Sequence, residues 1–137
     1  MDGDHRRVVV GAAIVRDRRL LAQQRAWPAS HAGRWELPGG RVEHGESDAD
    51  ALVRECAEEL GVRVAPGERV GEDVPLPGGR SVLRIYAATL ADPSAEPHAV
   101  EHRALRWLDA ADLTTVDWLD ADRMLVPWLH ALLAATP

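Results

Sequence analysis

Residues 39–62, with the sequence GGRVEHGESDADALVRECAEELGV, constrain this chain more than any other stretch. The stretch opens on a glycine pair after Pro38, which suits a turn whose backbone passes close to another group. Ser47 is placed to cap the start of a helix, and Gly61 is placed to end it in a left-handed conformation. The helical periodicity predicts one apolar face, made of Ala49, Leu52, Val53, Cys56 and Leu60.

Three glutamates share a different face of the same predicted helix, namely Glu55, Glu58 and Glu59. Carboxylates at this spacing repel one another by about 1 kcal/mol per close pair in water, and by several-fold more when they are partly buried. Glu46 adds another acid just before the helix, and only Arg54 offers local compensation. A divalent cation would relieve the repulsion, and oxygen-only ligands suit Mg²⁺, with Mn²⁺ as the alternative. The other interpretation, a solvated acidic face, is disfavoured by the glycine turn and the spacing.

The fixed positions of the stretch form a pattern that resembles the Nudix box of the Nudix hydrolases. In chain order, these positions are Gly40, Glu46, Arg54, Glu55, Cys56, Glu58, Glu59, Gly61 and Val62. The one departure is Cys56, where the family usually has an aliphatic residue, and a buried cysteine behaves as a small hydrophobic side chain. The flanking sequence WELPGG is similar to the MutT-type branch, whose members hydrolyse nucleoside triphosphates.

The pattern of apolar segments predicts an α/β sandwich with a mixed sheet. Strands are expected at residues 6–15, 19–25, 35–37, 81–90 and 103–108, with a short strand and connection within 62–74. A terminal helix is expected over residues 120–134, kinked or restarted near Pro127. The resemblance implies the same architecture, an α/β/α Nudix fold in which the box forms a loop-helix-loop, with residues 1–137 as a single Nudix hydrolase domain.

The resemblance also implies a metal site and its supporting residues. The implied ligands are the carboxylates of Glu55, Glu58 and Glu59 and the backbone carbonyl of Gly39. Arg54 is expected to pair with Glu46 and so to keep the ligands oriented. Gly40 and Gly61 are expected to support the loop and the helix end.

A further glutamate after the third main strand often joins the metal site in this branch, and Glu101 matches it by lying six residues before Trp107. The other reading is an ordinary loop glutamate. Glu101 is expected to act as a ligand or as the general base, with Glu55 as the alternative base. The histidines His31, His98 and His102 match no tight zinc motif, so they are expected to be loop residues.

The resemblance implies that Asp122 faces the base of the substrate. An acid here is similar to the CTP pyrophosphohydrolase branch, whereas the enzyme for oxidised guanine has an amide. A carboxylate can accept from the cytosine amine, and equally from guanine, so the base stays open. The other candidates for substrate binding are Arg25, Trp35, Arg80 and Arg84, and the possible stacking partners are Trp27, Trp35, Tyr86 and Trp118.

Composition narrows the class of partner. A net charge of −6 argues against broad binding to a nucleic-acid polymer, although a nucleotide is compatible because a metal can offset its charge. No apolar run approaches the length of a membrane span, and a single cysteine excludes an internal disulfide, which fits a reducing cytoplasm. All sixteen basic residues are arginine, which favours a GC-rich bacterial genome. The chain is expected to be a monomer or a homodimer.

Three functions remain open from the sequence. The first is hydrolysis of a nucleoside triphosphate to the monophosphate and pyrophosphate, acting on 8-oxo-dGTP and 8-oxo-GTP or on CTP, dCTP and 5-methyl-dCTP. The second is a Nudix hydrolase of another diphosphate, such as ADP-ribose, a nucleotide sugar or a dinucleoside polyphosphate. The third is a non-catalytic nucleotide sensor, which the intact set of box glutamates disfavours.

Overall fold

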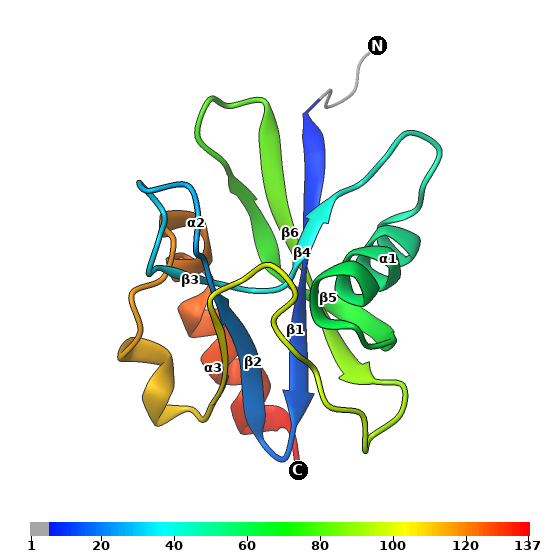
Figure 1. Ribbon diagram of the computed structural model, residues 1–137, viewed down its shortest axis with the longest axis vertical. Coiled ribbons are helices and arrows are strands. Elements are labelled where there is room, and N and C mark those ends of the chain that lie inside the picture. Colours follow the sequence, from blue (N-terminus) through cyan, green and yellow to red (C-terminus); the bar gives the residue numbers. More distant parts are fainter. Residues whose placement is uncertain (1–5) are drawn as a thin grey trace.

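The computed structural model describes residues 6–137, and within this range the strands form one mixed sheet of seven (Figure 1). The strands are β1 (Arg7–Arg16), β2 (Arg19–Gln24), β3 (Trp35–Glu36), β4 (Gly39–Arg41), β5 (Val64–Pro75), β6 (Ser81–Leu90) and β7 (Ala104–Leu108). The helices are α1 (Asp48–Leu60), α2 (Asp120–Arg123) and α3 (Val126–Ala135), with a short 3₁₀ helix, η1, at Ala111–Thr114. None of the helices in this range is long and apolar enough to span a membrane.

β1 is the central strand of the sheet, because one of its edges pairs with two other strands. It runs parallel to β6, but on its other edge it pairs with β4 at Val9–Gly11 and with β2 only at Val15 and Arg16. Between these two pairings, the N–H of Ala12 donates to the carbonyl of Pro38 at 2.7 Å. The sheet therefore divides along this edge, and the chain between β3 and β4 crosses the division.

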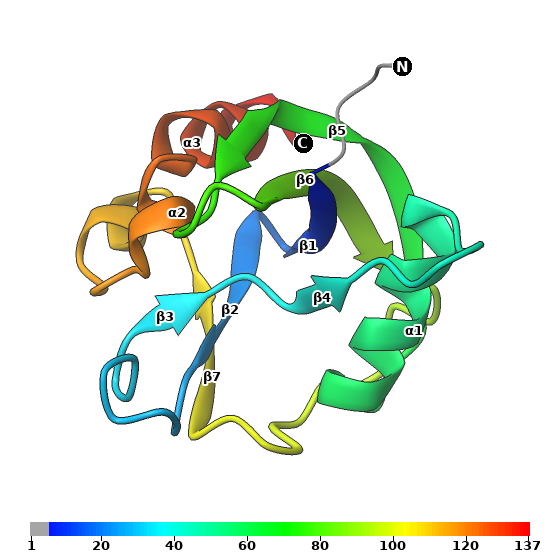
Figure 2. The same ribbon diagram turned by 90° about the horizontal axis from the view of Figure 1, so that it is seen from above.

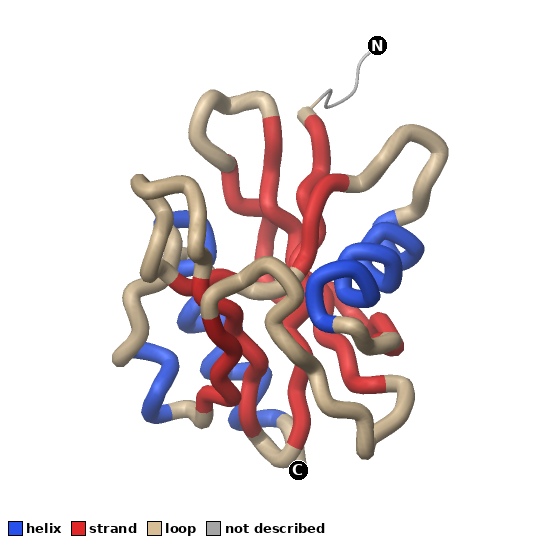
Figure 3. The backbone as a smooth tube through the Cα atoms, in the orientation of Figure 1, coloured by secondary structure: helices blue, strands red, loops and turns tan. Residues whose placement is uncertain are grey.

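Helices cover both faces of the sheet, with α1 on one side and α2 and α3 on the other (Figures 1 and 2; the tube of Figure 3 shows the same layers by secondary structure). Alternate residues of β1 belong to two separate apolar clusters, as the alternation of side chains along a strand requires. Val10, Ala12 and Ile14 pack under α1, whereas Ala13 packs with the residues of α3. This three-layer arrangement confirms the predicted α/β/α fold class.

The box helix α1 forms where its caps predict. The Oγ of Ser47 accepts from the N–H of Asp50 at 3.0 Å, and Gly61 ends the helix in the left-handed region at φ 69°. The predicted apolar face needs one correction, because Ala51 is buried and Ala49 is exposed. The periodicity gives the angular position of a face, but it does not show where along the helix the sheet begins to cover it.

Two other elements differ from the sequence prediction, and a third agrees with it. The glycine pair, predicted as a turn, belongs to the strand β4, whose pairing with β1 is too distant in the chain to be read locally. β5 is a long strand of twelve residues, and its two register irregularities against β6 hide its pattern. The predicted interruption near Pro127 is confirmed, since α2 and α3 are separate helices and α3 carries this proline in its first turn.

Candidate active site

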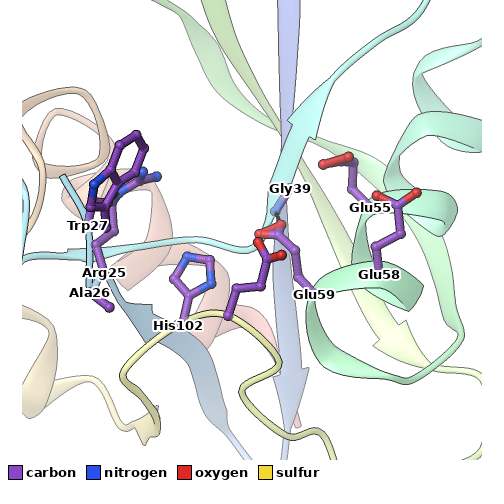
Figure 4. A pocket seen from close by; sticks show the side chains of 9 residues that line it. Arg25, Ala26, Trp27, Gly39, Glu55, Glu58, Glu59 and His102 are labelled. Atoms are coloured by element: carbon purple, nitrogen blue, oxygen red, sulfur yellow. Dashed lines mark hydrogen bonds between the residues drawn. The ribbon is translucent and has the colours of Figure 1, made fainter.

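The box glutamates open onto a cavity of about 440 Å³ where α1, β4 and the loop between β6 and β7 meet (Figure 4). The cavity is lined by Arg25, Ala26, Trp27, Gly39, Glu55, Glu58, Glu59, Glu101 and His102. Figure 4 shows the glutamates of α1 on one wall and Arg25, Trp27 and His102 on the opposite wall. The fold therefore brings together every residue predicted to hold the metal, including Glu101, which is 42 residues after Glu59 in the chain.

Glu59 is the most constrained of these acids. Its Oε1 accepts from Nε2 of Gln23 at 2.8 Å, and its Oε2 accepts from the N–H of Gly39 at 3.2 Å. Burial raises the pKa of Glu59 to about 7, against the lowering effect of these donors. Each carboxylate oxygen thus has one fixed donor, and the group is short of positive charge.

Arg54 pairs with Glu46 as predicted. Its Nε lies 2.8 Å from one oxygen of Glu46 and its Nη2 lies 2.9 Å from the other, which is a two-point contact. This guanidinium lowers the pKa of Glu46 to about 2. Nη1 of Arg54 also donates to Oε1 of Glu55 at 2.8 Å, yet burial still raises the pKa of Glu55 above its ordinary value.

The two glycines of β4 are required by close approach. A Cβ on Gly39 would lie 1.9 Å from the carbonyl oxygen of Val10, and a Cβ on Gly40 would lie 1.7 Å from Oε2 of Glu55. Gly39 also has φ +155°, a backbone conformation that side chains disfavour. The pair lets the strand lie against β1 on one side and against the carboxylate of α1 on the other.

The donors around this cavity fit a hard divalent cation. They are carboxylate oxygens together with the backbone of Gly39, the set that Mg²⁺ and Mn²⁺ prefer. Among residues 6–137, however, no three acidic, histidine or cysteine side chains converge into a ready-made metal site. The contacts give the reason, since Arg54 holds Glu55 and the side chain of Glu58 is 60% exposed. The cavity supplies the ligands and the negative charge, and the same Arg54 keeps Glu55 from joining the others.

Glu36 is a site residue that the sequence reasoning missed. Its Oε2 lies 2.8 Å from Nε2 of His102 and 3.2 Å from Nη1 of Arg25. Glu36 therefore anchors two lining residues of the acidic cavity, and it also lines a second cavity on its other side. Its position next to Trp35 in the sequence WELPGG was the available signal.

The second cavity has a volume of about 580 Å³ and walls that are mostly apolar. Val9, Leu37, Val74, Leu76, Leu83, Ala121 and Met124 form much of these walls. Gly39 lines both cavities, so the two adjoin at β4. Asp122 also lines the second cavity and is only 5% exposed, with its Oδ2 accepting from the N–H of Leu37 at 2.9 Å. Burial raises the pKa of Asp122 to about 7.

Three residues predicted to bind substrate line neither of these cavities. Trp35 is buried in the core, and Arg80 lies in the turn between β5 and β6. Arg84 contacts Asp48 at 3.1 Å and Asp73 at 2.8 Å. The alternation along β6 explains its direction, because the neighbouring Leu83 lines the second cavity and Arg84 must then point to the opposite face. Of the aromatic residues predicted to stack, only Trp27 lines a cavity.

In this α/β/α fold, an acidic cavity lies between the strand β4, which carries the glycine pair, and the helix α1, which carries the three glutamates. This combination defines the Nudix class. The chain belongs to the Nudix hydrolase family, since the family model described as NUDIX domain matches residues 5–129. This membership confirms the resemblance found in the box.

Two curated relatives and one solved structure show how much of the chain is shared. The chain is 51% identical over 119 residues to the Mycobacterium tuberculosis protein named "Putative 8-oxo-dGTP diphosphatase 2", covering 85% of this chain and 82% of the relative. It is 38% identical over 129 residues to the "CTP pyrophosphohydrolase" of Escherichia coli, covering 94% and 95%. The solution structure of the E. coli ORF135 protein superimposes with a TM-score of 0.79 at 37% identity, covering 96% and 93%.

Alanine variants of the two glycines should separate the effect on stability from the effect on metal binding. Gly39→Ala should lower the free energy of unfolding by about 2 kcal/mol or more, because its Cβ meets the backbone of Val10. Gly40→Ala should cost less stability, because its Cβ meets the flexible end of Glu55, and should instead weaken Mn²⁺ binding. Urea denaturation and Mn²⁺ titration of both variants measure this. Equal losses of stability in the two variants would contradict the assignment.

Asp122→Asn tests the buried acid through the pH dependence of stability. The pKa of Asp122 is raised from 3.8 to about 7, so at intermediate pH the folded protein keeps a proton that the unfolded chain releases. This contribution to stability is full below about pH 4 and disappears as the pH rises through about 7. The stability of the wild type relative to Asp122→Asn should therefore fall by a few kcal/mol between about pH 5 and pH 8 in metal-free urea denaturation.

Asp120→Asn is the control for this experiment. Asp120 is exposed, and its hydrogen bond to Arg34 lowers its pKa, so it is ionised in both states over the same pH range. The stability of the wild type relative to Asp120→Asn should not change with pH. If it fell with pH as it does relative to Asp122→Asn, Asp122 would not be the cause.

Proposed function

We propose that this protein is a divalent-metal-dependent pyrophosphohydrolase that converts a nucleoside triphosphate to the monophosphate and pyrophosphate. The observation that carries the proposal is the pair of adjoining cavities on either side of Gly39, one acidic and one apolar with a buried carboxylate. The acidic cavity suits the metal and the phosphates, and the apolar cavity suits a base. The names of the two curated relatives, a diphosphatase and a pyrophosphohydrolase, support the same reaction class.

In this proposal Glu55, Glu58 and Glu59 hold Mg²⁺ together with the carbonyl of Gly39, and Mn²⁺ is the alternative ion. The bound ion would neutralise phosphate charge and lower the pKa of a water. Glu101 or Glu55 accepts the proton of the attacking water.

Arg25 serves the phosphate end of the substrate. It lies on the wall opposite the glutamates, and its link to Glu36 at 3.2 Å fixes its position. The exposed Trp27 lies beside it on the same wall. A cation facing the acidic wall gives a polyphosphate a positive contact that does not depend on the metal.

Asp122 recognises the base, and its protonation state selects which one. A neutral carboxylic acid presents one donor and one acceptor, which match N3 and the N4 amine of cytosine. An ionised carboxylate presents only acceptors, which match N1–H and the N2 amine of guanine or 8-oxoguanine. Because burial raises the pKa of Asp122 to about 7, both forms are populated near neutral pH. The substrate classes are therefore cytidine triphosphates and guanosine triphosphates, including the oxidised ones.

The experiment that tests the reaction incubates the protein and Mg²⁺ with 8-oxo-dGTP, dGTP, dCTP, 5-methyl-dCTP, CTP, ADP-ribose and a dinucleoside polyphosphate. Chromatography then identifies all products, including pyrophosphate and nucleoside monophosphates. Pyrophosphate with a nucleoside monophosphate from one of the triphosphates is the expected result. Hydrolysis of only ADP-ribose or the dinucleoside compound would replace the proposal with a diphosphate hydrolase. Nucleotide binding without any hydrolysis would indicate a sensor.

Glu58→Gln should lower kcat/KM at least about tenfold, or roughly 1.4 kcal/mol, because an amide cannot supply the charge of the carboxylate ligand. The fold should be kept, since the side chain of Glu58 is 60% exposed. Glu68→Gln is the control, because Glu68 is an exposed acid of β5 that lines neither cavity. Normal turnover in Glu58→Gln would remove Glu58 from the metal site.

The ratio of kcat/KM for dCTP to that for 8-oxo-dGTP should fall as the pH rises through about 7, because Asp122 loses its proton there. The ratio cancels effects on metal binding that the two substrates share. Asp122→Asn cannot ionise, so its ratio should be shifted from that of the wild type and should not vary with pH. A wild-type ratio that is constant across the range would exclude Asp122 as the selector.

A further inference from the structure

A fully buried amide lies beneath the box helix. Gln23, in β2, has no solvent exposure. The alternation of the strand places it on the same face as Leu21, which belongs to the apolar cluster under α1. Its partners across the sheet are Leu105 of β7, which packs against that cluster, and Glu36 of β3. Gln23 therefore has apolar neighbours on one side and acidic residues, Glu36 and Glu59, on the other.

The amide is only half satisfied. Nε2 of Gln23 donates to Oε1 of Glu59 at 2.8 Å, but Oε1 of Gln23 has no hydrogen-bond partner among the described residues. A buried polar atom without a partner costs about 1–3 kcal/mol. A methionine would fill the same space without that cost, so packing does not explain the glutamine. What it supplies, and what an apolar residue lacks, is the donor to Glu59.

This donor completes the support of Glu59. The N–H of Gly39 holds the other carboxylate oxygen at 3.2 Å, and the backbone carbonyl of Glu59 accepts from the N–H of Val100 at 3.2 Å. The neighbouring Glu58 has no such support apart from Arg54 at 3.6 Å, and its side chain is 60% exposed. Among the three box acids, Glu59 is thus the one whose two carboxylate oxygens are both held by neutral donors, whereas Glu55 is held by Arg54.

We propose that Gln23 is a positioning residue that orients the carboxylate of Glu59 for metal binding. The inference rests on the proposed function, because it needs Glu59 to be a metal ligand. Removing a residue that orients a metal ligand typically lowers metal affinity or activity about 10–100-fold. Gln23 acts from the sheet, through a hydrogen bond that spans 36 residues of sequence.

The test measures the Kd for Mn²⁺ by electron paramagnetic resonance, without substrate, in the wild type and in two variants. Gln23→Met keeps the size and removes the donor, and Gln23→Asn keeps the amide but shortens its reach. Both should raise the Kd about 10–100-fold. Circular dichroism and thermal melting establish that each variant is folded, and the Asn variant carries the test if the Met variant is not.

The matched control is Gln24→Met. Gln24 is the next residue of the strand, and its Nε2 donates to the carbonyl of Gly33 at 3.0 Å, away from the glutamates. Its Kd for Mn²⁺ should equal that of the wild type. An equal loss in the Gln24 and Gln23 variants would mean that any change in β2 disturbs the site, and it would overturn the inference.

A double-mutant cycle shows whether Gln23 acts through Glu59. In a Glu59→Gln background, adding Gln23→Met should change the Kd for Mn²⁺ by no more than about twofold, because the interaction is already lost. A full further loss in that background would overturn the inference. The same cycle on kcat, with KM for the nucleotide unchanged, should show the same pattern.

Failure of the inference and failure of the proposed function give different results. If the wild type binds Mn²⁺ and the Gln23 variants bind it equally well, only the role of Gln23 is overturned. If the wild type binds no Mn²⁺ and hydrolyses no nucleotide, the metal site itself is overturned, and the positioning role with it.

Discussion

The close approach of β4 to β1 and to α1 is the contact on which the rest of the site depends. Gly39 lies against the carbonyl of Val10, and Gly40 lies against the carboxylate of Glu55, at distances that admit no side chain. This contact puts the backbone of Gly39 between the acidic cavity and the apolar one. It also turns one face of a charged helix toward a strand, which partly shields the carboxylates of Glu55 and Glu59 from solvent.

Gathering acids in one cavity costs free energy, and the structure deals with each acid differently. The two-point contact with Arg54 lowers the pKa of Glu46 to about 2, so Glu46 stays ionised at neutral pH. Glu59 is half-buried and has neutral donors in place of a cation, and the burial raises its pKa to about 7. Glu58 stays in solvent. These glutamates thus differ in pKa and in exposure because their partners and burial differ.

The sequence was most informative where partners are close along the chain. The caps of α1 and the acidic face follow from residue type and helical spacing over a few residues, and the pairing of Arg54 with Glu46 was implied by the resemblance to the Nudix box. It was least informative where partners are distant. Arg84 was expected at the substrate, but its ion pairs with Asp48 and Asp73 lie on the other face of β6. Glu36 went unnoticed, because its partner His102 is 66 residues away.

The sequence by itself determined the family, the box helix and the set of acids proposed to bind a metal, since these depend on residue identity and local spacing. The tertiary structure alone decided which of those acids are buried, which donors hold them, and that a second cavity with Asp122 adjoins the first. The physical reason is that hydrogen bonds across the sheet and the loss of solvent depend on segments far apart in the chain. Local patterns carry no information about either.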